Sequence, residues 1–374
     1  MKDITPDLCA ALFTGFRRYD QRIRARQYVD GLLSAPGRKS IANIAAAVGG
    51  PGDEQRLHHF VSDSRWNWDP LRSALTRTLE QRARSAVWVV RPVSIPKAGE
   101  HSVGVGRHFS ADAEHVVNGQ QAYGIWFASR EAAVPVSWRM RLTGRWGRER
   151  SSGDEGVSGL LADVRRWGDP RRPVLLDVGD VPEAPALVSR HLREGCPLAV
   201  RIGGGLPLTP VRPTVAGAGR RAVPARRILA TARRLRATPV TGGRGPGSVV
   251  TARVRLPGVG LAQEPLVLFG VWDGTAVAGS PPGPSEVWLT NMGTVSPGAL
   301  WSLTRLPHRV AEGWRTRGAA VGLRDFEGRS LAGWHRHMTL ASCAYTILSL
   351  RAAAPSSPSL APPVTPVSRV RSAA

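Results

Sequence analysis

The sequence is poor in cysteine and lacks any long apolar run, and these shortages narrow the class of protein. Three cysteines, Cys9, Cys196 and Cys343, lie far apart and fit no metal-ligand spacing, which suits buried thiols in a reducing compartment. No apolar run reaches the roughly 18–20 residues that span a bilayer, and the N-terminal residues do not read as a cleavable signal. We therefore expect a cytoplasmic protein with no membrane partner.

Acidic residues and lysine are also scarce. The 374 residues include 51 Lys+Arg against 28 Asp+Glu, a formal net charge of +23, and the only lysines are Lys2, Lys39 and Lys97. Codon bias in a GC-rich genome explains arginine in place of lysine but not the excess over acids. A positive field attracts polyanions, and arginine holds phosphate with paired hydrogen bonds. Double-stranded DNA is the expected partner, with a nucleoid-associated location; a merely basic surface is the alternative.

Residues 1–84 have apolar positions at helical spacing, with a breaker at 34–37 and Pro70 at the start of a last helix. A short helix, a glycine turn and a second helix resemble a helix-turn-helix, although many small helical bundles share that pattern. We expect a helical region here, whose role is either to bind DNA or purely structural.

From residue 85 the periodicity changes to that of strands. Apolar or alternating runs at 87–90, 101–109, 122–129 and 134–142 are followed by strands at 172–179 and 196–202 with a helix between them. Strands that first follow one another and then alternate with helices indicate a mixed α/β sheet. Helices are expected again at 299–320 and 331–353.

A basic, β-rich segment at 203–292 interrupts this core. Its arginines are either phosphate contacts or a solvated face. The candidate DNA contacts, with the lysine before the insertion, are Lys97, Arg220, Arg221, Arg226, Arg227, Arg233 and Arg234. We expect three regions: 1–84, a core at 85–353 containing this insertion, and a low-complexity, disordered tail at 354–374.

Five segments in one order resemble a known family. They are IPKAGEHSVGVGRHFS (95–110), VPVSWRMRLTGRW (134–146), PVLLDVGD (173–180), EVWLTNM (286–292) and VGLRDFEGRSLAGWHRHMTLASCAYTIL (321–348). Together they are similar to the insertion-sequence 701-like transposases of the DDE superfamily. The resemblance implies an RNase H-like mixed sheet with flanking helices, an N-terminal helical region and a β-rich insertion.

The resemblance also implies a chemistry. Such enzymes cut and join DNA with two divalent metals that clamp the attacking and leaving oxygens. Mg²⁺ prefers hard oxygen ligands, so three acidic side chains must converge from distant parts of the chain.

Only one of those acids is present at the position that the resemblance assigns to it. Asp177 matches the second acid, whereas Arg91 stands at the first position and Ala311 at the third. Glu312 is the candidate substitute for the third acid, although one residue along a helix turns a side chain by about 100° away from the expected direction. Asp177 is thus the sole candidate metal ligand, and Mg²⁺ is expected only if the protein is active.

These observations predict a DNA-binding protein of transposase origin whose strand cleavage and transfer are impaired. Two alternatives stay open. One is an active transposase that uses displaced acids, Asp177 and Glu312. The other is a non-catalytic regulatory protein on the same fold. The sequence leaves a homodimer open.

Overall fold

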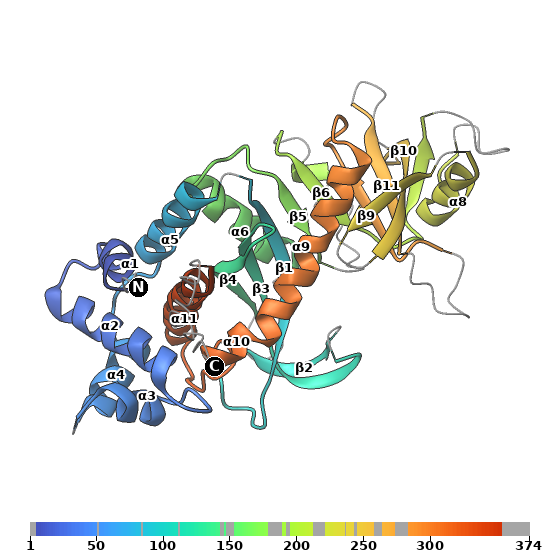
Figure 1. The fold of residues 1–374 in the computed structure, drawn as a ribbon. Helices are drawn as coiled ribbons and strands as arrows, with labels where there is room; N and C mark the ends of the chain where they lie inside the picture. Colours follow the sequence, from blue (N-terminus) through green and yellow to red (C-terminus); the bar gives the residue numbers. More distant parts are fainter. Residues whose placement is uncertain are drawn as a thin grey trace, which may run out of the picture.

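The fold places an α/β core between a helical region and a β-rich lobe (Figure 1). It is given by a computed structural model. The residues that it describes are 5–50, 52–83, 85–110, 113–142, 146, 153–178, 189–191, 195–211, 221–235, 237–242, 245–257, 264–273 and 283–353. The predicted tail at 354–374 lies outside these ranges. Among the described residues, no helix has the length and apolarity to cross a membrane.

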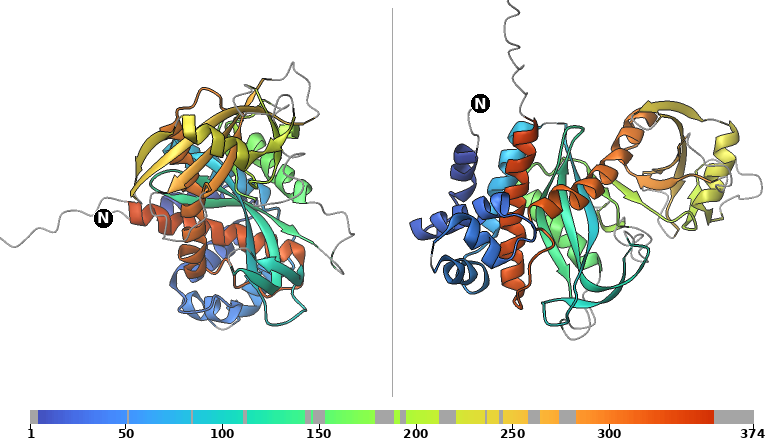
Figure 2. Two further views of the ribbon diagram at one scale, coloured as in Figure 1. Left: turned by 90° about the vertical axis from the view of Figure 1, so that its right-hand side faces the viewer. Right: turned by 60° about the horizontal axis from the view of Figure 1, so that its bottom comes forward.

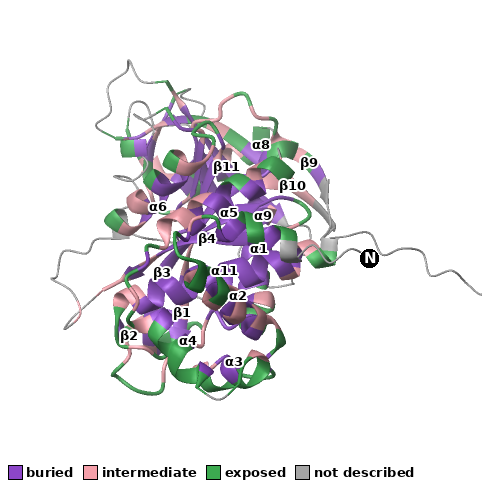
Figure 3. Cartoon of the chain, turned by 90° about the vertical axis from the view of Figure 1, so that its left-hand side faces the viewer, coloured by how far each residue is buried: buried purple, intermediate pink, exposed green. Residues whose placement is uncertain are grey.

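The N-terminal region is helical, as its periodicity predicts. Its helices are α1 (Thr5–Phe13), α2 (Tyr19–Ser34), α3 (Ile41–Val48), α4 (Asp53–Ser62) and α5 (Asp69–Arg82). Ser40 caps α3, since its hydroxyl accepts a hydrogen bond from the Asn43 amide at 3.2 Å. The outer side of α3 is exposed, whereas the helices' inner sides are buried against α11 (Figure 3).

The core sheet contains β1 (Val87–Pro96), β2 (Val105–Ser110), β3 (His115–Ala128), β4 (Ala133–Arg141), β5 (Val174–Leu176) and β6 (Leu198–Arg201). Strands β4, β3 and β1 pair antiparallel, and β1, β5 and β6 pair parallel. The order β4-β3-β1-β5-β6 is that of an RNase H-like sheet, so the predicted fold class is confirmed. The strand predicted at 101–109 begins later, at Val105.

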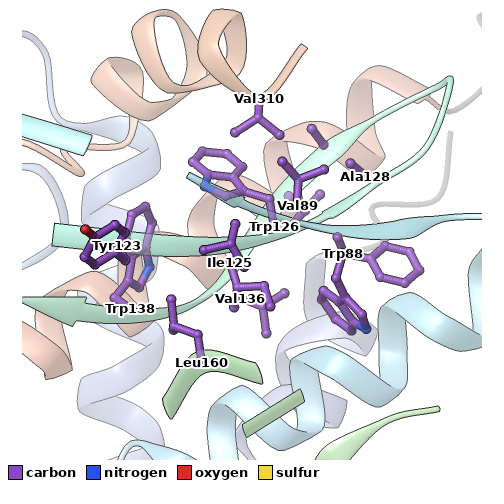
Figure 4. Packing of buried hydrophobic residues seen from close by; sticks show 14 of the residues in the cluster. Trp88, Val89, Tyr123, Ile125, Trp126, Ala128, Val136, Trp138, Leu160 and Val310 are labelled. Carbon is purple, nitrogen blue, oxygen red and sulfur yellow. The ribbon is translucent and has the colours of Figure 1, made fainter. Parts of the chain in front are cut away.

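Helices cover both faces of this sheet. They are α6 (Gly153–Trp167), α9 (Pro297–Arg315), α10 (Arg317–Ala320) and α11 (Leu331–Ala353). Leu160 of α6 and Val310 of α9 pack on opposite sides of β3, the latter near the fully buried Trp126 (Figure 4). Burial of such large aromatic side chains fixes α9 against the sheet beside β1.

The insertion continues the same sheet. It holds β7 (Pro207–Pro210), β8 (Val223–Pro224), α8 (Ala225–Leu235), β9 (Thr238–Gly242), β10 (Gly245–Arg255), β11 (Leu266–Asp273) and β12 (Glu286–Thr290). Strand β12 pairs antiparallel with β6, and α8 packs against β10 and β11. The lobe stands apart from the N-terminal helices, with α9 running between the two parts (Figures 1 and 2).

Candidate functional site

Three charged residues lie side by side where the parallel pairing of β1, β5 and β6 ends. Strand register pairs Val90 with Leu176 and Leu176 with Val200, so the next residues, Arg91, Asp177 and Arg201, are neighbours. The Asp177 amide donates to the Val90 carbonyl at 2.9 Å and holds the residue in place.

Asp177 is buried between two guanidinium groups. Its side chain is only 5% exposed; Arg91 Nη1 lies 3.3 Å from Oδ2, and Arg201 Nη1 lies 3.1 Å from Oδ1. Each carboxylate oxygen therefore accepts a charge-assisted hydrogen bond, the stronger kind in proteins. The first two positions that the resemblance assigns to acids meet in space, but as an ion pair.

Helix α9 reaches the same cluster. Arg91 Nη1 also lies 3.4 Å from the carbonyl oxygen of Pro307, inside α9. A side chain four residues further along a helix lies beside such a carbonyl, as Ser302 shows in this helix by donating to Gly298 O. Ala311 lies four residues after Pro307 on α9, so its methyl group lies on the side of the helix that carries this carbonyl.

Glu312 is exposed and faces elsewhere. Burial chiefly raises the pKa of Tyr345 on α11, Arg317 opposes that rise, and the negative charge of Glu312 adds to it. Glu312 is thus close enough to Tyr345 to act on it, whereas Asp177 pairs with Arg91 and Arg201.

A second acid near the cluster escaped prediction. Glu286, at the start of β12, is buried; its Oε1 lies 2.6 Å from His308 Nε2, and its Oε2 accepts from Trp288 Nε1 at 2.8 Å. Burial raises the pKa of Glu286, but the hydrogen bonds from His308 and Trp288, with Arg201 nearby, hold it below its usual value. Trp288 pairs with Arg201 across the strands, which brings this acid beside the cluster.

The donor set does not fit a two-metal centre. In the part of the chain that the structure describes, no group of three His, Cys, Asp or Glu side chains is placed to hold a metal ion. Mg²⁺ requires several hard oxygen ligands, whereas Asp177 gives both oxygens to arginines. Mg²⁺ therefore has no role that these residues support.

The predicted DNA contacts divide into two groups. Arg221 and four arginines of α8 are exposed. The helix buries Ala225, Ile228 and Leu229 against the lobe and leaves its arginines exposed, namely Arg226, Arg227, Arg233 and Arg234. The Arg233 guanidinium lies 4.9 Å from the centre of the Trp272 ring. Arg220 lies outside the described residues.

Lys97 is engaged within the protein. Its Nζ donates to the carbonyl oxygens of Arg324 and Phe326 at 2.8 and 2.7 Å, which uses two of its three protons. Burial lowers the pKa of Lys97 to about 8. This lysine links β1 to the segment before α11 instead of standing free on the surface.

Comparisons with known proteins identify the family of this chain. No curated protein matches the chain. Among solved structures, a cryo-EM structure of a piggyBac transposase synaptic complex with hairpin DNA is similar to this chain, with a TM-score of 0.39 and 10% sequence identity. The similarity covers 89% of this chain and 66% of that chain, so this chain spans just under two thirds of the other protein's length. The model of the family described as DDE superfamily endonuclease matches residues 11–246, more than half of the sequence. The chain therefore belongs to the DDE superfamily endonucleases.

Proposed function

We propose that this protein binds double-stranded DNA and descends from an insertion-sequence 701-like transposase, with its strand cleavage and transfer impaired. The observation that carries the proposal is the ion pair between Arg91 and Asp177, at the strand ends where the family's chemistry requires two acids.

The physical reason is one of charge. Metal-assisted phosphodiester chemistry needs converging anionic oxygens. A guanidinium stays protonated at any accessible pH and has no lone pair to offer a metal. Arg91 therefore cannot serve as a ligand, and it neutralises Asp177, the acid beside it. With a methyl group at Ala311, one carboxylate remains where three are needed.

Restoring the acids tests this proposal. The double substitution Arg91→Asp with Ala311→Glu places carboxylates at both missing positions. Arg91 contacts Asp177, and Ala311 lies four residues after Pro307, whose carbonyl oxygen Arg91 also reaches. We expect Mn²⁺ to raise the melting temperature of the double variant and not that of the natural protein. Metal at about 100 times its Kd stabilises a fold by about 2.7 kcal/mol. A double variant that folds but is indifferent to Mn²⁺ contradicts the assignment of these positions.

Nicking of supercoiled DNA separates the alternatives. The impaired protein is expected to leave the plasmid intact with Mg²⁺ or Mn²⁺. Metal-dependent nicking that is lost in both Asp177→Ala and Glu312→Ala would instead support an active enzyme with displaced acids. Nicking that survives Asp177→Ala would exclude the family mechanism altogether.

The outward arginines of α8 are the proposed duplex contact. Their support is exposure on one helix whose other side is buried. Duplex affinity is expected to fall steeply with salt, and replacing Arg226, Arg227 and Arg234 with Gln is expected to reduce the slope of log K against log salt by about 3. Arg329→Gln, an exposed arginine outside the lobe, is the control. Weak binding at physiological salt would favour a regulatory protein without DNA chemistry.

The division of the chain is also part of this proposal. We place a helical region at 1–84, which is a second candidate for DNA contact, and the catalytic-type core at 85–353 with its insertion at 203–292. Nucleoid association would follow from duplex binding, and a homodimer is to be tested by sedimentation.

A further inference from the structure

A small basic cavity lies at a junction in the sheet, far along the strand order from α8. Strand β3 changes its edge partner there: Gln121 pairs with Arg141, the last residue of β4, and Gln120 pairs with Val105, the first residue of β2. The ends of two strands thus meet on one edge of β3, and ladder pairing does not fill the gap between them.

Glycines keep this gap open. Gly104 has φ of +73°, a conformation that side chains rarely adopt, and a Cβ there would collide with Met140 Sδ. The cavity has a volume of about 190 Å³, several times the roughly 30 Å³ that one water molecule takes up in the liquid. Its lining contains no carboxylate; it consists of Gly104, Gly106, Arg107, His108, Gly119, Gln121 and Arg141.

Arg141 is the donor that this cavity leaves unsatisfied. Its Nη1 donates to Gln121 Oε1 at 3.2 Å, but its Nε is buried and has no hydrogen-bond partner among the described residues. A buried donor without an acceptor destabilises the fold, because it has lost its hydrogen bonds to water and gained none in return. An anion in the cavity would remove that destabilisation, and the exposed Arg107 would add a second positive charge at the rim.

His108 forms a wall and not a ligand. Its Nε2 lies 2.7 Å from Ser94 Oγ and its Nδ1 lies 3.3 Å from the Gly106 carbonyl oxygen. The neutral ring satisfies both contacts, with Nδ1–H donating to Gly106 and Nε2 accepting from Ser94. Burial, with a contribution from Arg141, lowers the pKa of His108 even though the Gly106 carbonyl opposes this shift.

We propose that this junction binds a phosphate oxyanion, held by the Arg141 guanidinium with Arg107 at the rim. The same chemistry is offered by a phosphodiester of a DNA strand and by free phosphate. The site is separate from both the Asp177 cluster and α8, so it stands whether or not the proposed function does.

Isothermal titration calorimetry with inorganic phosphate tests the site, over concentrations suited to a Kd of about 1 mM. We expect Arg141→Gln to weaken binding at least tenfold and Arg107→Gln to weaken it less. Arg141→Lys keeps the charge but loses the planar fork, so its affinity should lie between those of the natural protein and Arg141→Gln. Arg329→Gln is the matched control, and melting curves in chloride check that each variant folds.

Two further measurements sharpen the result. The imidazole pKa of His108, followed by NMR, should rise when phosphate fills the cavity, because an anion stabilises the charged ring. A thymidine dinucleotide that competes with phosphate and loses affinity in Arg141→Gln identifies a strand phosphodiester as the source, whereas binding of phosphate alone identifies the free ion. Phosphate binding that is equal in the natural protein and Arg141→Gln, or absent from the folded natural protein, overturns the proposal.

Discussion

Arginines inside the core and arginines on α8 serve opposite purposes. Arg72, on α5, is completely buried and donates to Thr339 Oγ1 at 2.9 Å and to Ser137 Oγ at 3.1 Å. Arg226 and Arg234, on α8, turn their guanidinium groups to solvent. The first kind joins helices to the sheet, while the second kind faces solvent.

The comparison shows that the formal net charge overstates the positive charge exposed on the surface. Of the arginines behind the +23, Arg72 is consumed by internal hydrogen bonds and Arg91 by its pairing with Asp177. The charge that faces solvent comes from exposed arginines: those of α8 share one helix whose other side is buried, and others, such as Arg56 and Arg77, lie in the N-terminal region. Substitutions that distinguish the two kinds of arginine therefore test this division.

The largest effect is expected at Arg72. Arg72→Ala leaves a cavity and removes the hydrogen bonds that Thr339 Oγ1 and Ser137 Oγ accept from Arg72. We therefore expect a loss of about 4 kcal/mol in the free energy of unfolding. Urea denaturation measures this loss. The exposed Arg234→Ala, in contrast, should change stability by less than about 0.5 kcal/mol.

Arg72→Met separates packing from hydrogen bonding, because methionine fills much of the volume but donates nothing. Replacement of buried charge by an apolar side chain of similar volume is at times neutral. A variant as stable as the natural protein would show that Arg72 acts by filling space, and the comparison with α8 would then rest on shape and not on bonding.

The second effect is expected at the cluster on the strand ends. Asp177→Asn leaves Arg91 and Arg201 facing one another without the charge that joins them. Breaking a buried pair from one side costs about 3 kcal/mol, and Arg201, at 38% exposed, limits the cost because it can turn to water. Thermal unfolding in low salt is the measurement.

A surface pair is the control for that substitution. Arg18 and Asp20 also form an ion pair, but both side chains are more than half exposed. Asp20→Asn should cost less than about 1 kcal/mol. Equal losses for the two aspartate substitutions would mean that the cluster at Asp177 behaves like any exposed ion pair.

Much of the fold was predictable from the sequence, for reasons that particular residues make clear. Apolar runs such as 87–90 and 134–142 predicted β1 and β4, and the five family segments predicted their RNase H-like arrangement. Helix α6 was missed, although Val157, Leu160, Leu161 and Val164 recur at helical spacing and are buried.

The contacts of the cluster were not predictable in the same way. The sequence showed that Arg91 replaces an acid, but its meeting with Asp177 and Arg201 depends on the parallel register of three strands. Glu286 and His308 lie 22 residues apart in the sequence and form a hydrogen bond. The pairing of β12 with β6 and the placement of α9 bring them together. Periodicity predicts which face a residue is on, but not which strand lies beside it.

The smallest of the three effects is expected at His337, a buried side chain that is neutral, unlike the buried arginines. His337, on α11, is buried with Nδ1 2.9 Å from Tyr28 Oη and Nε2 2.8 Å from the Gly322 carbonyl oxygen. The neutral ring satisfies both: Nε2–H donates to Gly322, and Nδ1 accepts from Tyr28. Burial lowers the pKa of His337 to about 4, with Lys97 assisting, and the Gly322 carbonyl and Asp325 oppose the shift.

This shift predicts acid sensitivity. A histidine in the unfolded chain titrates near pH 6.5, so between that pH and about 4 the unfolded state binds a proton that the folded state does not. Stability must therefore fall as the pH falls through this window, by about 2 kcal/mol between pH 7 and pH 5 from His337 alone. His335 adds to the slope, because burial and the charge of Arg72 also lower its pKa.

Urea denaturation at both pH values should show that the stability of His337→Gln depends less steeply on pH than that of the natural protein. His115→Gln, at an exposed position, should keep the full slope; an unchanged slope in His337→Gln would mean that the buried ring is not the group that acid attacks.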